Sequence, residues 1–174
     1  MSLDPSQIVG NMQKSFNVYL EDGLTGETVN FNEDPFDTGG LESWYAVRYV
    51  GYSTESTGMG DLIEEDTSQE GRLHVLECEV SAWCRDDPQR AELGEMVDKV
   101  MALCEVAVVT FYDFADPRNP VEIGDMWLRP QRGTFSPVWG GGGPVWKSSG
   151  DEHAEAGVVG FVLEMNLVAI AEVG

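Results

Sequence analysis

The chain has 174 residues, with 31 acidic residues against 10 Lys and Arg, so its formal net charge at pH 7 is -21. Such a charge repels nucleic acid and anionic lipid, which argues against a DNA-binding protein or a protein of the membrane surface. Because 42% of the residues are hydrophobic, including five Trp, the sequence is too apolar for a disordered acidic tail, and its length predicts one domain over residues 1–174.

The first half of the chain predicts one helix and two strands. Apolar residues recur at helical spacing over residues 5–20, which predicts an N-terminal helix. A short strand is predicted at residues 28–31, and a longer one, rich in Tyr and Val, at residues 43–53. Residues 54–71 follow as an acidic loop, which is far longer than the two to five residues that a hairpin turn needs.

A strand predicted at residues 72–85 leads directly into a helix at residues 88–104. Apolar and polar residues alternate along the strand, so one of its faces is expected to meet a core. The residues predicted to point into that core are His74, Leu76, Cys78, Val80, Ala82 and Cys84. Trp83 lies on the opposite, polar face, where it indicates either a contact with another protein or a cover formed by the chain's own loops. The helix carries an apolar stripe typical of packing on a sheet, and Asp87 can cap its first turn.

Three further strands are predicted at residues 106–111, 121–128 and 158–170, the first of them buried. The order of helix, strands, helix and strands predicts an α+β fold. In this fold a mostly antiparallel sheet is covered on one face by two helices. The segments 54–71 and 138–157 are expected to be long loops that extend from the domain as arms.

The residue patterns predict no catalytic, cofactor or metal site. The Gly-rich stretch at residues 140–148 differs from a phosphate-binding loop, because Trp146 stands where that motif requires the Gly before its Lys. His74, Cys78 and Cys84 lie along one strand and cannot converge on one metal ion. The sequence therefore predicts a protein that is not an enzyme and binds no cofactor.

The cysteines favour a reduced setting. Their number, three, is odd, and Cys78 and Cys84 would lie about 20 Å apart on one strand, too far for a disulfide. No apolar run approaches the roughly 18 residues of a membrane span, and the first ten residues lack the basic and apolar regions of a secretory signal. We therefore expect a protein made in a cytoplasm, without a membrane partner.

Over residues 5–112 the order of these segments resembles the tail terminator proteins of long-tailed bacteriophages. The resemblance rests on element order and includes no catalytic signature. The segments that carry it are the N-terminal helix, VNFNEDPF at 29–36, the aromatic strand ESWYAVRYVGYS at 42–53, the acidic loop, the strand RLHVLECEVSAWCR at 72–85 and the helix DDPQRAELGEMVDKVMALC at 86–104.

The resemblance implies a virion protein that forms a homo-oligomeric ring, expected to be a hexamer. Such a ring caps the tail-tube protein, joins the tube to the head-side connector protein, and lets DNA pass without specific binding. The acids expected to face its lumen are Glu55, Asp61, Glu64, Glu65, Asp66 and Glu70. The residues expected at subunit or partner interfaces are Trp83, Arg85, Glu77, Glu79, Met59, Leu62, Ile63, Trp139 and Trp146.

Three alternative functions stay open at this point. The chain could be another neck or tail-tube component, for which a ring is expected as well. It could be an acidic DNA mimic, which needs a rigid array of surface carboxylates. It could also be an enzyme, such as a small transferase, whose catalytic groups come together only in space.

Overall fold

The computed structural model describes residues 7–31, 41–56, 71–85, 91–135, 145–148, 151–154 and 158–172. Its elements, in chain order, are helix α1 (Ile8–Gly23), strands β1 (Val29–Asn30), β2 (Ser43–Ser56) and β3 (Gly71–Arg85), helix α2 (Ala91–Cys104), and strands β4 (Val108–Asp113), β5 (Val121–Phe135), β6 (Val145–Ser148), β7 (Asp151–Ala154) and β8 (Val158–Glu172). The predicted α+β fold is confirmed.

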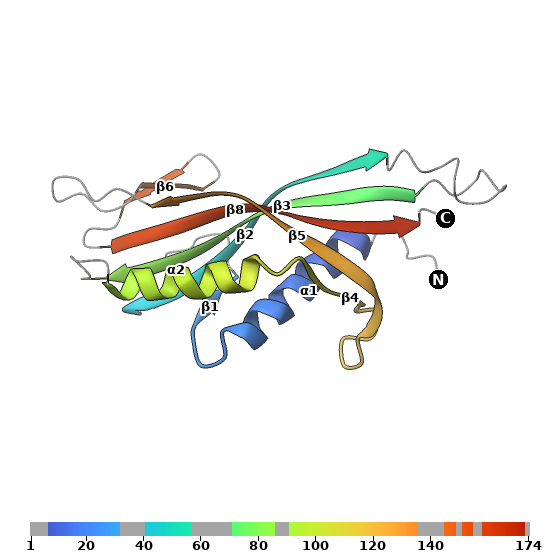
Figure 1. The fold of residues 1–174 in the computed structure, drawn as a ribbon, viewed down its shortest axis with the longest axis horizontal. Coiled ribbons are helices and arrows are strands. Elements are labelled where there is room, and N and C mark those ends of the chain that lie inside the picture. Colours follow the sequence, from blue (N-terminus) through green and yellow to red (C-terminus); the bar gives the residue numbers. More distant parts are fainter. Residues whose placement is uncertain are drawn as a thin grey trace.

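Six strands form one sheet in the order β1-β2-β3-β8-β5-β4, and β6 pairs with β7 in a separate two-stranded sheet. Only β1 and β2 pair in parallel, so the main sheet is mixed but mostly antiparallel. The central strands β3 and β8 stay in register along their full length, from Gly71 opposite Glu172 to Arg85 opposite Val158. Figure 1 shows the strong twist of this sheet, whose strands cross near the middle of the molecule.

Both helices cover one face of the sheet. Because of the twist, α2 lies over one half of the sheet and α1 over the other half (Figure 1). The apolar stripes of the helices meet the inward side chains of the strands, and each large side chain buried there contributes roughly 1.5–3 kcal/mol to stability. The largest fully buried side chains in this core are Ile8, Met12, Phe16, Leu20, Tyr45, Leu93, Met126, Leu163, Met165 and Leu167.

Both segments predicted to be loops contain strand residues, so these predictions were wrong in part. β2 continues to Ser56 and β3 begins at Gly71, because the ladder between the two strands extends to Ser56 opposite Arg72. The remaining residues 57–70 lie outside the described part. Within the predicted loop at 138–157, β6 and β7 pair as a hairpin.

β5 extends well beyond its predicted end at residue 128. It passes through Pro130, which cannot donate a ladder hydrogen bond and is placed at an irregularity of register between Pro130 and Arg132. The prediction that β4 is buried was also wrong. As an edge strand it buries Val109 and Phe111 on one face, whereas Val108 on the other face is exposed.

Candidate interaction surfaces

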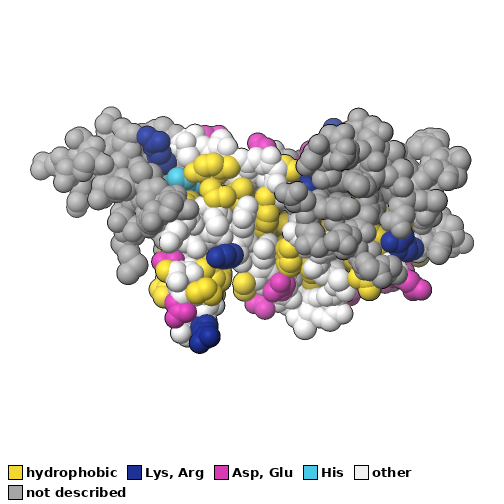
Figure 2. All heavy atoms as spheres, turned by 180° about the vertical axis from the view of Figure 1, so that it is seen from behind, with side chains coloured by type: hydrophobic (Ala, Val, Ile, Leu, Met, Phe, Trp, Pro, Cys, Tyr) yellow, Lys and Arg dark blue, Asp and Glu magenta, His cyan; other side chains and the backbone are white. Residues whose placement is uncertain are grey.

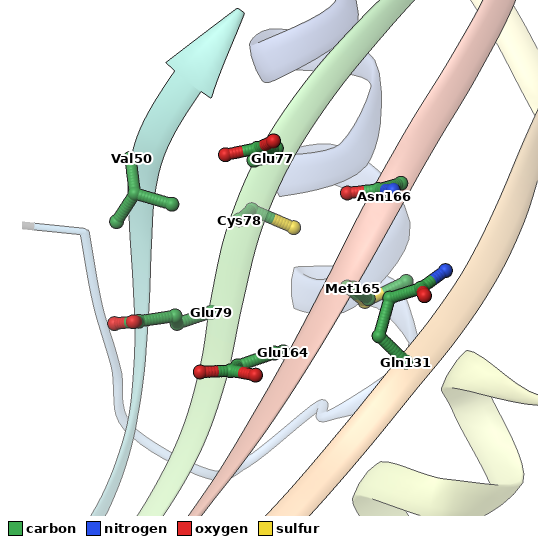
Figure 3. A pocket seen from close by; sticks show the side chains of 8 residues that line it. All are labelled: Val50, Glu77, Cys78, Glu79, Gln131, Glu164, Met165 and Asn166. Carbon is green, nitrogen blue, oxygen red and sulfur yellow. The ribbon is translucent and has the colours of Figure 1, made fainter.

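The face of the sheet opposite the two helices carries charged side chains at its centre. They line a hollow of about 360 Å³ formed by Val50, Glu77, Cys78, Glu79, Gln131, Glu164, Met165 and Asn166. Figure 3 shows that the three carboxylates lie on the side away from α1. Glu79 and Glu164 are direct cross-strand partners, which places two like charges side by side. Among the described residues, no group of three His, Cys, Asp or Glu side chains could hold a metal ion.

Arg48 of β2 balances one charge of this acidic hollow. Its Nη2 atom lies 2.9 Å from Oε2 of Glu79, and its Nε donates a hydrogen bond of 3.1 Å to the same oxygen. Both side chains are largely buried, with exposed fractions of 18% and 16%. Glu79, predicted at a partner interface, is therefore engaged within its own chain.

We expect Arg48→Gln to lower the free energy of unfolding by about 1–3 kcal/mol, because it leaves the partly buried carboxylate of Glu79 beside Glu164 without its cation. Urea denaturation of the monomer measures this loss. Lys99→Gln is the matched control, since it breaks an exposed ion pair with Glu27, and it should cost clearly less than Arg48→Gln. Equal costs for the two variants would contradict the assigned role of Arg48.

Trp83 was predicted as a candidate interface residue, and the structure corrects this prediction. Its side chain is 1% exposed and packs with Trp44, Ala46 and Val158 in a second apolar cluster on the face opposite the helices. Its Nε1 donates a hydrogen bond of 2.8 Å to the Ser81 hydroxyl. The chain itself covers Trp83, so this residue is not available to a partner.

Arg85 and Glu77, also predicted at an interface, differ in how far their side chains are held by contacts within the chain. Arg85 lies over the Trp44 ring, 5.0 Å from its centroid, and its Nε donates a hydrogen bond to the carbonyl of Leu41. Glu77 is exposed. The structure therefore leaves Glu77 as an accessible candidate and holds Arg85 in a contact within the chain.

Most of the site residues predicted in the two long loops lie outside the described part of the chain. Glu55, a predicted lumen acid, is exposed near the end of β2. Trp146 lies in β6, but its side chain is outside the described part. The predicted residues that lie wholly outside the described part are Met59, Asp61, Leu62, Ile63, Glu64, Glu65, Asp66, Glu70 and Trp139.

His74, predicted to be a core residue, is buried. The Tyr52 hydroxyl lies 2.6 Å from its Nδ1, and the two rings are stacked with centroids 6.0 Å apart. Its buried Nε2 has no hydrogen-bond partner among the described residues. Burial, and to a lesser extent the positive charge of Arg72, lower the pKa of His74 below its usual value.

This lowered pKa predicts that the chain loses stability in mild acid. The unfolded chain protonates His74 near pH 6.5, whereas the folded chain resists protonation, so the free energy of unfolding should fall as the pH drops below about 6.5. His74→Leu should make this decline shallower. Urea denaturation between pH 5 and pH 7.5 measures both slopes. Identical slopes in the two proteins would show that His74 does not titrate differently on folding.

Helix α1 closes one edge of the sheet. The buried side chains of Asn11 and Ser15 accept hydrogen bonds from the backbone of β4 and the residue after it. The Tyr112 amide donates to the Ser15 hydroxyl at 3.0 Å, and the Phe114 amide donates to Oδ1 of Asn11 at 3.1 Å. Amide groups that would otherwise face an open edge are thus satisfied within the chain.

Two long strand segments have a single paired neighbour among the described residues. β1 pairs with β2 only at Tyr45 and Ala46, so residues 49–56 of β2 pair with β3 alone among the described residues. β4 pairs with β5 only as far as Trp127, and residues 129–135 of β5 pair with β8 alone in the described structure. We call these segments the β2 open edge (49–56) and the β5 open edge (129–135).

The sequence patterns did not identify these edges as interaction surfaces. Alternation of apolar and polar residues predicts a strand but does not predict which strands lie beside it. The unpaired half of a strand therefore has the same residue pattern as the paired half. The exposed side chains that they contribute include Val50, Tyr52, Arg129, Arg132 and Phe135. A useful signal was present in β5, whose last seven residues include two Arg in a strongly acidic chain.

Figure 2 shows one face of the molecule. The described acidic side chains on this face lie mostly near its upper and lower outline and do not form a continuous array.

The described part of the chain contains no helix that is both long and apolar enough to span a membrane. Comparisons with protein-family models and with curated proteins found no match to this chain.

Proposed function

We propose that this chain is a structural subunit of a bacteriophage neck, a tail terminator that assembles into a homo-oligomeric ring. The ring would cap the tail tube and join it to the head-side connector. The observation that carries this proposal is the pair of exposed open edges on one sheet, while α1 closes the β4 edge. Unpaired strand edges are templates for strands of another chain.

Two further features support a ring. The α+β fold, with two helices on one face of a mostly antiparallel sheet, agrees with the architecture that the resemblance to tail terminators implies. The two open edges are also different surfaces, and contacts between different surfaces form a ring when the rotation from one copy to the next closes. We expect six copies, as the resemblance implies.

The net charge of -21 suits a channel through which DNA must slide. Carboxylates that face the lumen would keep phosphates from binding to the wall. Glu55 is the one predicted lumen acid that the structure describes, and it is exposed. The remaining candidates lie in residues 57–70.

We expect neutralisation of the acids at residues 61–70 to slow DNA ejection while assembly stays intact, because an uncharged channel wall repels phosphate less. Ejection from purified particles, followed by a DNA-binding dye, measures the rate. The matched control neutralises five exposed acids on the two helices, Glu21, Asp22, Glu92, Glu95 and Asp98. Unchanged ejection in particles that carry the loop variant would exclude an electrostatic role for this segment.

Electron microscopy of complete particles tests the proposed position. A peptide tag added to the chain and decorated with antibody fragments should label a single collar between head and tail. Label along the whole tail would identify a tube protein instead. The absence of label on intact particles, with the tagged chain present in the lysate, would contradict a virion role.

A further inference from the structure

We propose that the β5 open edge of one copy pairs with the β2 open edge of the next copy, so that the sheets of neighbouring subunits join head to tail. The inference rests on the proposed ring and names the two strands that build its interface. The residues concerned are 49–56 of one copy and 129–135 of the next.

The two edges match in length and exposure. The β2 open edge has eight residues and the β5 open edge has seven, which corresponds to about 23–26 Å of paired strand. All seven residues at 129–135 are exposed, and so are five of the six residues at 50–55 of β2, namely Val50 and Tyr52 to Glu55. In Figure 1 the end of β2 and the end of β5 lie at opposite ends of the molecule, so one copy can offer both edges at once.

The charges of the two edges are complementary. Arg129 and Arg132 are both exposed on the β5 open edge, which contains no acid, whereas Glu55 is exposed on the β2 open edge. None of these three side chains has a hydrogen-bond or ion-pair partner among the described residues. In a chain of net charge -21, a segment with two Arg and no acid is where another copy can approach with least repulsion.

Both edges also expose large apolar side chains. Val50 and Tyr52 on the β2 open edge are 49% and 46% exposed, and Phe135 at the end of the β5 open edge is 48% exposed. Pairing of the strands would remove part of this surface from water. In the paired interface the apolar groups would form the core and the Arg side chains would form a charged rim.

Irregularities of register limit how the edges can pair. β2 is irregular between Tyr49 and Gly51, and β5 between Pro130 and Arg132. Such bulges interrupt the regular ladder and disfavour pairing in arbitrary registers. Pairing of β2 with β2 would instead close a two-fold dimer and leave the Arg residues of β5 exposed.

Chemical crosslinking between variants that each carry one added cysteine tests which strands meet. The native Cys78, Cys84 and Cys104 are all buried, so an added surface cysteine is the reactive one. Thr54→Cys marks the β2 open edge and Thr134→Cys the β5 open edge. A short bis-maleimide should link the two variants when they are mixed under conditions that allow assembly, whereas neither variant alone should give linked dimers. Val121→Cys, exposed outside both edges, should not link to Thr54→Cys.

Charge reversal provides a second, independent readout. Arg129→Glu combined with Arg132→Glu should raise the concentration needed for half-maximal assembly by about tenfold or more, because like charges then face each other. Adding Glu55→Arg should restore part of the lost affinity. Arg118→Glu, which changes an exposed charge in the turn before β5, should have little effect. Sedimentation velocity over a range of protein concentrations measures all four proteins.

Failure of this pairing can be told apart from failure of the proposed function. Rings that form without crosslinks between Thr54→Cys and Thr134→Cys, and that tolerate the charge reversal, would overturn the pairing and leave the ring intact. Crosslinks within Thr54→Cys alone would overturn it in favour of two-fold pairing. A chain that stays monomeric even on tail tubes would contradict both the pairing and the proposed function.

Discussion

Replacement of Trp83 with alanine is expected to lower the free energy of unfolding of the monomer by about 3–5 kcal/mol. The side chain is 1% exposed, and its Nε1 donates to the Ser81 hydroxyl. Its ring also lies against Gly160, where an added Cβ would come within 2.2 Å of a ring carbon. The variant loses these contacts and leaves a cavity beside Trp44.

Urea denaturation of the monomer measures this loss. Phe135→Ala is a useful comparison, because Phe135 is also aromatic but is 48% exposed at the β5 open edge. It should cost the monomer less than about 1.5 kcal/mol and should weaken assembly instead. If Trp83→Ala left the monomer as stable as the native chain and only prevented assembly, Trp83 would be an interface residue after all.

The second large effect is expected at the edge that α1 closes. Asn11→Ala removes the acceptor of the Phe114 amide, and Ser15→Ala removes that of the Tyr112 amide. Each change should cost about 1–3 kcal/mol, because a buried or partly buried donor loses its partner. The two losses should add only approximately, since both residues act on one segment of the same strand.

Hydrogen exchange locates this effect. The amides of Tyr112 and Phe114 should exchange faster in the respective variants, and the double variant should tend to self-associate through the uncovered β4 edge. Glu21→Ala, an exposed change on α1, serves as the control and should alter stability by no more than about 0.5 kcal/mol. Unchanged protection of both amides would show that α1 does not cap this edge.

Local patterns were sufficient to predict most of the elements. Alternation along residues 72–85 placed His74, Cys78 and Cys84 on the core side, and all three are buried there. Both helices were found from their apolar stripes, with ends that differ by a few residues. The helix at 88–104 is described from Ala91, while Asp87, its predicted cap, lies outside the described part.

Features that depend on distant neighbours were harder to predict. The burial of Trp83 requires Trp44 from β2 and Gly160 from β8 on the same patch, and nothing in the local pattern brings these strands together. The extension of β5 past Pro130 depends on the pairing with β8. The open edges follow from the order of the strands, which is a property of the whole sheet.

The same limit applies to the candidate interface residues. On β3 the sequence predicted Glu77, Glu79, Trp83 and Arg85, and this central strand is paired on both edges. The proposed interface at Arg129 and Arg132 could not be predicted from residue type, because it depends on one side of β5 being unpaired among the described residues. Strand order, more than residue type, decides where another chain can add to this fold.

The oligomeric state of the purified chain is the most direct test of the central claim that copies assemble head to tail into a ring. Native mass spectrometry, over a range of concentrations and in the presence of tail tubes, should detect one closed species, expected to be a hexamer, that forms alone or on the tubes. A monomer at every concentration that also fails to bind tail tubes would contradict the account.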